Sequence, residues 1–397
     1  MKTHILVVCQ YYYPENFQVT PICEQLAKDG YGVTVLTGLP NYPSGIIPEE
    51  YKEGHRDEII NGVHVIRCWE IPRRKGALGL GLNYLSFLLS ASAKAIRLPR
   101  FDCVLVYQLS PITMGIPAIL YAKRHHVPLL LYCCDLWPES VKIYIQDEKH
   151  PVYRIVNWVS KKVYRACDRI LLQSECFAAY LEHVHSISRD KMAHLPAFSD
   201  EGYLSEDFDE KHEGINFVFL GNLGIAQNLL AVLDAVCKIR HIGGFVVHFV
   251  GDGSCLGDMQ AFVVKNQLEN IVKFHGRRPP EEMPRFYRLA DACLISLANN
   301  SAVGLTLPSK VQGYMAAGKS ILGMIDGDTA KVVAEAECGE CVSAGDIEGF
   351  SALLEKFIVD PTRYEQCGEN GRKYFRRHFR QSVFMERLEQ ELDTLRR

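Results

Sequence analysis

The chain has 397 residues, which is too long for one ordinary hydrophobic core and predicts two domains of roughly 200 residues each. Hydrophobic residues make up 48% and charged residues 23% of the chain, values typical of a soluble globular protein. The formal net charge of -3 provides no polycationic surface that would favour nucleic acid as a partner.

The cysteines and the apolar runs indicate a cellular compartment. The 14 cysteines are scattered along the chain, which argues against a disulfide scaffold or a zinc site and predicts reduced cysteines in a cytosol. The apolar run that follows Met1 is too short for a signal peptide and predicts a first buried strand. No run reaches the roughly 18 apolar residues of a membrane span.

Short apolar runs alternate with helical patterns along the first half of the chain. Strands are predicted at residues 5–9, 33–37, 63–68, 103–107, 129–133 and 170–173, with helices at 20–29 and 112–125 between them. Strands that alternate with helices favour a parallel, doubly wound sheet, an α/β class of fold. Ligands of such sheets bind beyond the carboxyl ends of the strands.

An acidic, loop-like segment leads to a second α/β series. Strands are predicted there at 216–220, 246–250, 272–275, 292–295 and 320–324, with helices at 227–239, 259–266, 283–289 and 309–317. The predicted division is an N-terminal domain at 1–198, a linker at 199–213, a C-terminal domain at 214–379 and a helix at 380–397 that packs back toward the first domain. Two similar domains joined in this way would face each other across a cleft.

Residues 304–320 carry the clearest single signal for a ligand site. An apolar turn with Thr306 leads to Pro308-Ser309, where a helix begins, and Lys310 falls in the first helical turn. The free N–H groups of a helix start, its dipole and a lysine ammonium together suit a phosphate or diphosphate. This segment alone leaves open the alternative of a capped core helix with an exposed lysine.

Several ordered motifs extend over nearly the whole chain. They are Tyr11-Tyr-Tyr-Pro-Glu15, Pro40-Asn-Tyr-Pro-Ser-Gly45, Asp135-Leu-Trp-Pro-Glu139, Gly221-Asn-Leu-Gly-Ile-Ala-Gln227, Gly251-Asp-Gly253, His275-Gly-Arg277, Pro308-Ser-Lys310 and Tyr314-Met-Ala-Ala-Gly318. With this set the chain resembles the retaining sugar-nucleotide glycosyltransferases of the GT-B fold, family 4 type, which consist of two Rossmann-like domains. Within that class it is most similar to bacterial transferases of the WbuB type, which add an N-acetylated deoxyhexosamine during O-antigen or capsule assembly.

The resemblance implies a site for a UDP-sugar donor in the second half. Gly221, Asn222 and Gly224 follow a strand, so backbone N–H groups there can approach a phosphate, unless the segment is a plain turn. Most relatives keep an arginine at the position of Asn222 and a lysine at that of Gln227. The further expected donor-binding residues are Gly251, Arg277, Gly304, Leu305, Thr306, Ser309 and Lys310. Arg277 has a surface role as its alternative, whereas Lys310 is left as the main cation for the leaving diphosphate.

A second departure from the family concerns catalysis. Many relatives carry two glutamates seven residues apart, and the matching positions here are Leu305 and Gly313. Because neither side chain can hydrogen-bond a hydroxyl, Thr306, Ser309 and Gln312 are the nearby candidates for sugar contacts. The resemblance also implies catalysis without a metal ion or a cofactor, with a lysine and helix dipoles in place of a divalent cation.

An acceptor site is expected in the first half. Asp135 ends a buried strand, where a carboxylate can take the proton of an acceptor hydroxyl or orient the acceptor; capping of the next helix is the alternative. Glu139 is the second choice for this catalytic role. Acceptor contacts are expected from Tyr13, Glu15, Asn16, Asn41 and Tyr42, and a purely structural turn is the alternative for the loop at 41–45.

Residues 73–100 combine basic and apolar character. Arg73-Arg74-Lys75 precede a mostly apolar stretch, and Lys94, Arg97 and Arg100 follow. Basic residues that flank an apolar helix suit an anionic membrane surface, and a buried helix with a basic end is the alternative. Because the resembled family uses lipid-linked acceptors, we expect a cytoplasmic protein with peripheral contact at the inner face of the cell membrane.

The resulting hypothesis is transfer of a sugar from a UDP-sugar to a polyprenyl-diphosphate-linked saccharide, with retention, in O-antigen or other surface polysaccharide synthesis. The implied sugar is an N-acetylated 6-deoxyhexosamine. The missing glutamate pair motivates a rival, a non-catalytic GT-B partner of another transferase. A GT-B sugar-nucleotide epimerase, which acts on the donor alone, is a third hypothesis.

Overall fold

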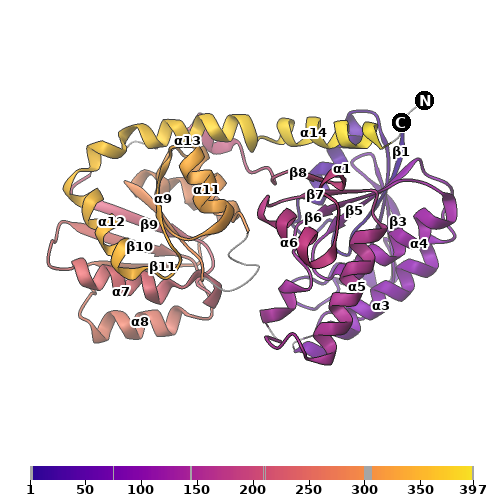
Figure 1. Cartoon of the computed structure of the whole chain (residues 1–397), viewed down its shortest axis with the longest axis horizontal. Coiled ribbons are helices and arrows are strands. Elements are labelled where there is room, and N and C mark those ends of the chain that lie inside the picture. The colour runs from indigo at the N-terminus through magenta and orange to yellow at the C-terminus, as the bar shows by residue number, and fades with distance from the viewer. Residues whose placement is uncertain are drawn as a thin grey trace. The chain divides into compact units, whose positions relative to one another are not determined.

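The computed structural model describes residues 3–74, 76–143, 145–208, 210, 212–298 and 306–395. The chain divides into two compact α/β units, shown in Figure 1. Unit 1 comprises Met1–Leu195 and Met385–Arg397, and unit 2 comprises Pro196–Phe384. Each unit is built on a largely parallel sheet, so the predicted α/β class with two doubly wound domains is confirmed.

The sheet of unit 1 runs in the order β3-β4-β2-β1-β5-β6-β7-β8. These strands are β1 (His4–Val8), β2 (Gly32–Thr37), β3 (Asp57–Ile60), β4 (Val63–Arg67), β5 (Cys103–Gln108), β6 (Leu129–Cys133), β7 (Arg169–Leu172) and β8 (Met192–His194). Neighbouring strands are parallel except for the antiparallel pair β3 and β4. The central strands are continuous apolar runs because helices cover both of their faces.

Helices α1 (Val19–Lys28), α2 (Glu49–Glu53), α3 (Ala77–Ala95), α4 (Gly115–His125), α5 (Pro151–Ala166) and α6 (Cys176–His185) belong to unit 1. Helix α3 packs against α4 and α4 packs against α5, which makes one layer (Figure 1). The C-terminal helix α14 (Gln381–Thr394) contributes its later part to unit 1. There the Nε of Arg169 lies 2.6 Å from the Oε2 of Glu391.

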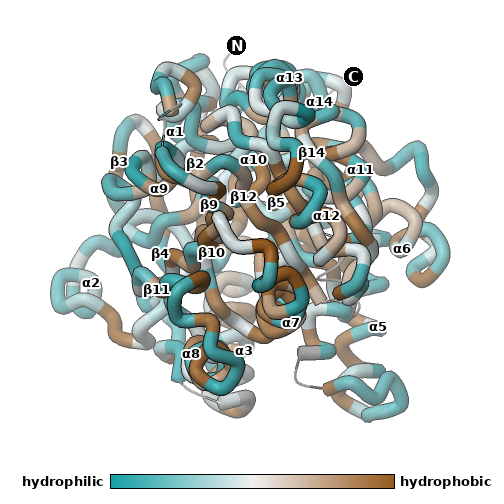
Figure 2. Tube along the Cα trace, turned by 90° about the vertical axis from the view of Figure 1, so that its left-hand side faces the viewer, coloured by the Kyte–Doolittle hydropathy of each residue, from teal (hydrophilic) through white to brown (hydrophobic). Residues whose placement is uncertain are grey.

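The sheet of unit 2 is parallel and runs in the order β11-β10-β9-β12-β13-β14. Its strands are β9 (Ile215–Leu220), β10 (Phe245–Val250), β11 (Val272–Gly276), β12 (Ala292–Ser296), β13 (Ser320–Met324) and β14 (Gly339–Val342). Its helices are α7 (Leu229–Ile239), α8 (Leu256–Lys265), α9 (Met283–Leu289), α10 (Ser309–Ala316), α11 (Gly327–Glu335), α12 (Ile347–Val359) and α13 (Glu365–His378). Figure 2 shows α7 as largely hydrophobic and α13 as largely hydrophilic.

Alternation along β9 divides the core of unit 2 into two layers. Phe217 and Phe219 pack with α7 and α12, whereas Val218 and Leu220 pack with α10 and α13. Successive side chains of a strand point to opposite faces, so one apolar run fills both layers. This packing fixes where β9 ends, and therefore where its ligand-facing loop begins.

The structure differs from the sequence predictions at sheet edges, at element boundaries and in several helices outside the predicted ranges, such as α5, α6, α12 and α13. Edge strands β3, β8 and β14 were not predicted, because their partly exposed residues give no buried apolar run. The helix predicted at 227–239 begins at Leu229, since residues 225–227 form a 3-10 turn. Residues 196–213, expected as a domain end and linker, belong to unit 2, where Phe208 is fully buried in the core.

All 14 cysteines lie in the described ranges as thiols outside any disulfide bond, and most are buried. Cys338 and Cys341 have the two-residue spacing of many zinc-binding pairs. Among the residues that the structure describes, no group of three His, Cys, Asp or Glu side chains is arranged to hold a metal ion. No helix in the described ranges is both long enough and apolar enough to cross a bilayer.

Candidate functional site

A cavity of about 580 Å³ opens in unit 2 at the carboxyl ends of β9, β10 and β11. Its lining consists of Gly221, Asn222, Val250, Gly251, Asp252, Gly253, Arg277, Arg278 and Met283. Ligands of doubly wound sheets bind at this edge, and the volume lies in the range of small-molecule sites. The predicted donor residues Gly221, Asn222, Gly251 and Arg277 all line this one cavity.

Two glycines form the back wall of the cavity. Gly221 and Gly251 have φ angles of 129° and 151°, which side-chain-bearing residues rarely adopt. A Cβ on Gly251 would collide with the carbonyl oxygen of Gly221. The N–H of Gly221 donates to the carbonyl of Val250 at 2.9 Å, which ties the ends of β9 and β10 together. The wall is therefore bare backbone that a ligand can approach closely.

Amide side chains organise the turn after β9. The N–H of Gly224 donates to the Oε1 of Gln227 at 3.3 Å, so Gln227 stabilises this turn. Asn222 instead lines the cavity. A Cβ on Gly224 would lie 2.7 Å from the Nδ2 of Asn222, and one on Gly253 would lie 2.7 Å from its Oδ1. The absence of side chains at Gly224 and Gly253 therefore leaves space for the amide of Asn222.

Lys310 lies in the first turn of α10, and its ammonium reaches the end of β9. Its Nζ is 4.1 Å from the centroid of the Phe219 ring, and a Cβ on Gly221 would lie 3.3 Å from it. The Nζ atom is buried and has no hydrogen-bond partner among the described residues. Burial lowers the pKa of Lys310 to about 8. A buried ammonium without a counter-ion is costly, so this position favours a bound anion.

The remaining predicted donor residues are spread around this centre. The carbonyl of Thr306 accepts a hydrogen bond from the Thr329 hydroxyl at 3.3 Å, and Ser309 is exposed. Gly304 and Leu305 lie outside the described residues. Gln312, considered above for a sugar contact, is buried and donates to the carbonyl of Ala197 at 2.5 Å. Its amide nitrogen is therefore committed to the fold.

In unit 1, Asp135 follows β6 at the carboxyl edge of the sheet. Its Oδ2 accepts a hydrogen bond from the Ser110 hydroxyl at 2.6 Å. The Nε1 of Trp137 donates to the same Ser110 oxygen at 3.2 Å, which fixes the hydroxyl. Burial raises the pKa of Asp135, although the Ser110 hydrogen bonds act in the opposite direction. These contacts hold the carboxyl group in one orientation, while burial keeps its pKa above the ordinary value, and both features suit acid–base catalysis.

Glu139, the second choice for a catalytic carboxylate, is surrounded by donors. Its Oε1 accepts hydrogen bonds from the hydroxyls of Tyr153 at 2.9 Å and Tyr180 at 2.8 Å. Its Oε2 lies 2.9 Å from the Nζ of Lys142. Both oxygens of this buried carboxylate are therefore already engaged by side chains of the fold. The geometry therefore favours a structural role for Glu139 and leaves Asp135 as the better catalytic candidate.

Two of the predicted acceptor residues build the loop that they were expected to present. The Oε1 of Glu15 accepts the N–H groups of Asn41 at 2.8 Å and Tyr42 at 2.6 Å. The Oδ1 of Asn41 accepts the N–H of Arg73 at 2.9 Å. Glu15 and Asn41 are buried, so their polar atoms shape the loop from inside.

Glu70 is a buried carboxyl group at this site that was not predicted. Its Oε1 accepts from the Nδ2 of Asn41 at 2.5 Å, and its Oε2 accepts from the Nε2 of Gln10 at 2.9 Å. Burial raises the pKa of Glu70 well above its ordinary value. The signal in the sequence was a single acidic residue shortly after the apolar strand β4, on the ligand-binding edge of the sheet.

Exposed side chains stand on this buried frame. Tyr13, Asn16 and Tyr42 are exposed. The Tyr42 ring centroid lies 5.3 Å from that of Phe17, and the guanidinium of Arg73 lies 5.3 Å from the same Tyr42 ring. A supported aromatic ring offers a rigid apolar face against which the C–H groups of a sugar can pack. These three exposed side chains remain the predicted acceptor contacts.

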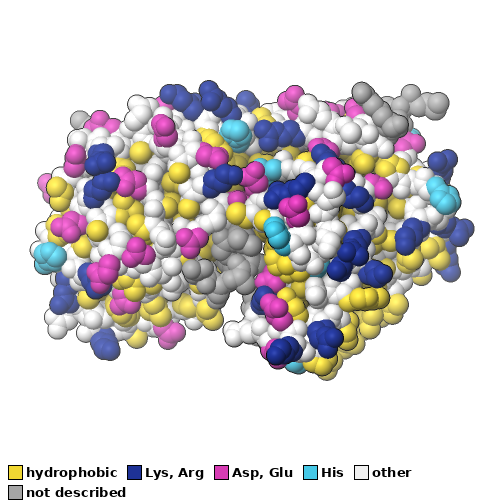
Figure 3. Space-filling view, in the orientation of Figure 1, with side chains coloured by type: hydrophobic (Ala, Val, Ile, Leu, Met, Phe, Trp, Pro, Cys, Tyr) yellow, Lys and Arg dark blue, Asp and Glu magenta, His cyan; other side chains and the backbone are white. Residues whose placement is uncertain are grey.

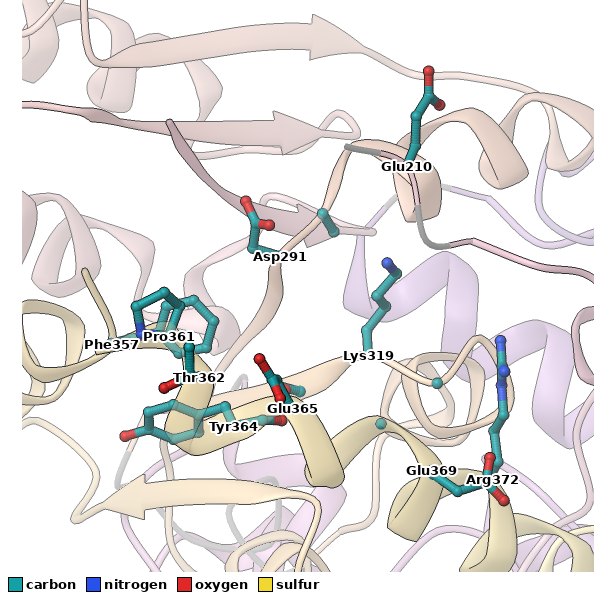
Figure 4. A pocket seen from close by; sticks show the side chains of 14 residues that line it. Glu210, Asp291, Lys319, Phe357, Pro361, Thr362, Tyr364, Glu365, Glu369 and Arg372 are labelled. Carbon is teal, nitrogen blue, oxygen red and sulfur yellow. Dashed lines mark hydrogen bonds between the residues drawn. The ribbon is translucent and has the colours of Figure 1, made fainter. Parts of the chain in front are cut away.

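A second cavity of unit 2, about 440 Å³ in volume, lies at the amino ends of β12 and β13 (Figure 4). Its cations are engaged in the fold: the Nζ of Lys319 donates to the carbonyl of Phe208 at 2.9 Å, and the Nη2 of Arg372 donates to that of Ala317 at 3.1 Å. Asp291 accepts the N–H of Asn216 at 2.7 Å. This cavity lies at the edge opposite the glycine-walled one, which is therefore the better candidate for a donor.

Protein-family comparisons match most of the chain. The glycosyl transferase 4-like domain matches residues 16–197, and the family named glycosyl transferases group 1 matches residues 204–374. The chain is a glycosyltransferase of the GT-B type. A comparison of this glycosyltransferase with curated protein sequences gave no match.

Solved structures share the architecture of the glycosyltransferase at low sequence identity. Sucrose-phosphate synthase from Thermosynechococcus elongatus matches with a TM-score of 0.75 and 16% identity over 99% of both chains. HepE of Anabaena in complex with UDP matches with a TM-score of 0.70 and 12% identity over 99% of this chain and 100% of that one. WaaG, a glycosyltransferase involved in lipopolysaccharide biosynthesis, matches with a TM-score of 0.65 and 15% identity over 97% and 98%. These likenesses establish the GT-B fold.

Proposed function

We propose that this glycosyltransferase moves a sugar from a UDP-sugar to a polyprenyl-diphosphate-linked saccharide, with retention, in O-antigen or other surface polysaccharide synthesis. The proposed sugar is an N-acetylated 6-deoxyhexosamine, as in the WbuB-type transferases that the chain resembles. The observation that carries the proposal is the buried Nζ of Lys310, which has no partner among the described residues and lies beside a glycine-walled cavity. The UDP bound by HepE supports a nucleoside diphosphate there.

The donor is proposed to bind unit 2 with its nucleoside in the cavity beside Arg277 and its diphosphate near Gly221 and Lys310. The bond from the sugar to the diphosphate breaks in the reaction, and negative charge develops on the leaving oxygen. A preorganised ammonium stabilises this charge in the transition state. Stabilisation of the leaving group would be the main catalytic role of Lys310.

The acceptor is proposed to bind unit 1. Its hydroxyl forms the new glycosidic bond and loses a proton, which Asp135 accepts or directs to the diphosphate. Retention requires the hydroxyl to attack from the face that the diphosphate leaves. Tyr13, Asn16 and Tyr42 supply the proposed saccharide contacts, while residues 73–100 make the proposed peripheral contact with the inner face of the membrane.

The non-catalytic rival rests on the absence of the glutamate pair. At one of the two positions, a Cβ on Gly313 would lie 2.8 Å from the hydroxyl of Tyr287, so the site has no room for a glutamate. The family's sugar-hydroxyl contacts would therefore come from other groups in this chain, and Thr306 and Ser309 are the proposed ones. The match to a glycosyltransferase family favours transfer over scaffolding.

A nucleotide-release assay tests the proposal. UDP, GDP and dTDP sugars are each incubated with the enzyme, with and without a simple polyprenyl-diphosphate sugar. We expect UDP to be released only when both substrates are present. Release or conversion of a donor without acceptor would support the epimerase instead, and absence of transfer from every donor would contradict the proposal. Lys310→Ala should lose the activity, whereas Lys265→Ala, at an exposed lysine on α8, should retain it.

A further inference from the structure

Helices α3, α4 and α5 contain no acidic residue. All of their Lys and Arg residues are therefore uncompensated within these helices: Lys94, Lys123, Arg124, Arg154, Lys161, Lys162 and Arg165. At the overall share of Asp and Glu in the chain, 47 of 397, helices of 19, 11 and 16 residues would carry about five. The adjacent helix α6 differs, since its Glu182 pairs with Arg189 at 2.8 Å.

These cations also lack acidic partners elsewhere in the described structure. None of the ion pairs of the described residues includes a cation of α3, α4 or α5. Helix α3 packs against α4 and α4 packs against α5, so the exposed parts of the three helices adjoin one another. Figure 3 shows Lys and Arg side chains among hydrophobic ones over this part of unit 1. The surface is therefore cationic over three successive helices.

Apolar side chains are exposed on the same helices. On α3, Leu78, Leu82, Leu85 and Leu89 recur at every third or fourth residue, and all four are exposed. Part of this stripe, with Trp69 and Ile71, lines an apolar groove of about 470 Å³. A groove of this kind can hold a hydrocarbon chain but offers almost no hydrogen-bonding group to a polar ligand.

Helix α5 carries a second exposed stripe. Val152, Ile155 and Trp158 are exposed, the last two by 62% each. The Nζ of Lys162 lies 5.8 Å from the Trp158 ring. A tryptophan and branched aliphatic residues next to cations form the pattern of helices that lie in a membrane interface, where the apolar groups enter the acyl region and the cations meet headgroups.

We propose that the α3–α5 surface docks on an anionic bilayer through two apolar stripes, that of α3 and that of α5. This inference rests on the proposed use of a lipid-linked acceptor and extends the membrane contact from residues 73–100 to α5. Anionic phospholipid is the occupant that fits, because the surface combines uncompensated cations with aliphatic side chains. An acidic soluble protein would leave the leucine stripe and its groove without a hydrocarbon partner.

The buried face of α5 links this surface to the proposed catalytic loop. The hydroxyl of Tyr164 accepts the N–H of Trp137 at 3.1 Å, and the hydroxyl of Tyr153 donates to Glu139 at 2.9 Å. Trp137 and Glu139 closely follow Asp135 in the chain. Docking through Ile155 and Trp158 would therefore hold the loop of Asp135 at a fixed height above the headgroups, where the diphosphate of a lipid-linked acceptor lies.

Vesicle sedimentation tests the proposal. The full chain is mixed with vesicles of phosphatidylcholine alone, or with vesicles in which about a third of the lipid is phosphatidylglycerol. We expect binding to the anionic vesicles only. The double variants Ile155→Ser/Trp158→Ser and Lys161→Glu/Lys162→Glu should each lower the apparent affinity by about tenfold. A matched control, Val264→Ser/Lys265→Glu on the exposed face of α8, should bind like the wild type.

Equal binding of the α5 variants and the wild type would overturn the role of α5. Equal binding to neutral vesicles, or association only with a soluble protein, would overturn the anionic bilayer as partner. UDP release with a short-chain, water-soluble acceptor should persist in both α5 variants, which shows that they fold. If no donor yields transfer while vesicle binding responds as expected, the proposed function fails and the docking surface stands.

Discussion

The two units present their carboxyl edges in opposite electrostatic states. At the edge of unit 2, the ammonium of Lys310 is buried without a partner among the described residues. At the edge of unit 1, the buried carboxyl groups of Glu15 and Glu70 are each hydrogen-bonded by two N–H donors. The first edge carries an ammonium, unpaired within the described ranges, that would suit an anion. The second carries a hydrogen-bond network that supports exposed side chains. Two similar folds thus differ at the same edge of the sheet, one with a buried charge and one with a hydrogen-bond network around its buried carboxyl groups.

The largest expected effect concerns Asp135. Asp135→Asn keeps the shape but removes the proton acceptor, so we expect kcat to fall by about 10²–10⁴-fold while the Kd for UDP is unchanged. Steady-state kinetics and calorimetry measure the two quantities. In the matched variant Glu139→Gln, the main effect should be a lower melting temperature, because this carboxylate holds Tyr153, Tyr180 and Lys142. A larger loss of kcat in Glu139→Gln at unchanged stability would instead make Glu139 the catalytic carboxylate and Asp135 the structural one.

Next in size is the effect of removing the unpaired charge. Lys310→Met keeps the apolar packing against Phe219 but removes the ammonium. We expect kcat/KM to fall by about 10²–10³-fold and UDP binding to weaken with it. Lys310→Arg should restore part of the binding, since it restores a cation. Unchanged UDP affinity in Lys310→Met would show that the diphosphate binds elsewhere.

The glycine wall of unit 2 can be tested through stability. Gly251→Ala places a Cβ against the carbonyl of Gly221 at a φ of 151°, so we expect a loss of about 1–3 kcal/mol in the free energy of unfolding. Gly257→Ala, where a Cβ meets open space in α8, should change stability little or raise it by about 0.5–1 kcal/mol. Thermal denaturation separates these variants, and equal melting temperatures would contradict the close approach of the two strand ends.

Glu70→Gln tests the buried hydrogen-bond network of Glu70 with Gln10 and Asn41 in unit 1. Glutamine has one oxygen for two donors, the amides of Gln10 and Asn41, and its own NH₂ would face one of them. We expect a loss of about 1–3 kcal/mol in stability together with a raised KM for the acceptor. UDP binding in unit 2 should not change. Glu53→Gln, at an exposed position of α2, is the control, and an equal effect there would contradict the buried network.

The lowered pKa of Lys310 predicts an effect that is small near pH 8 and grows with pH. The lysine of the free enzyme loses its charge as the pH rises through about 8, whereas a bound diphosphate holds the proton. UDP affinity should therefore fall by up to about tenfold per pH unit above 8, with proton uptake measurable by calorimetry in buffers of different ionisation enthalpy. Lys310→Arg should abolish this dependence, and a flat profile in the wild type would show that Lys310 remains charged.

The same lysine should make the ligand-free protein more stable as the pH rises, although UDP binding weakens. Its native pKa of about 8 lies below the ordinary value of about 10.4, so between these pH values the unfolded chain binds more protons than the native one. Stability without ligand should therefore rise across this window in the wild type relative to Lys310→Met. Chemical denaturation at pH 7.5 and pH 10 would measure this rise in the free energy of unfolding. Its size should correspond to the uptake of about one proton on unfolding.

The sequence predicts the buried strands because each is an apolar run, as at 129–133 and 320–324, but it does not predict the edge strands β3, β8 and β14. It could not predict which polar side chains face a ligand. The polar side chains of Asn41, Gln312 and Glu139 suit ligand contacts, but in the structure they form hydrogen bonds with other groups of the protein. Glu70 was missed because its partners, Gln10 and Asn41, come from distant strand ends. Such pairing depends on tertiary contacts that a local pattern does not contain.

Around the loop at 41–45, one set of residues holds the backbone and another set is exposed. Glu15 and Glu70 fix the backbone at Asn41 and Tyr42 without using any atom of the exposed side chains. Substitutions at Tyr13 and Asn16 should therefore leave the backbone of the loop in place, whereas those at Tyr42 also remove ring contacts with Phe17 and Arg73. If the proposed acceptor site is right, a library at these three positions should change which saccharide is accepted without unfolding unit 1.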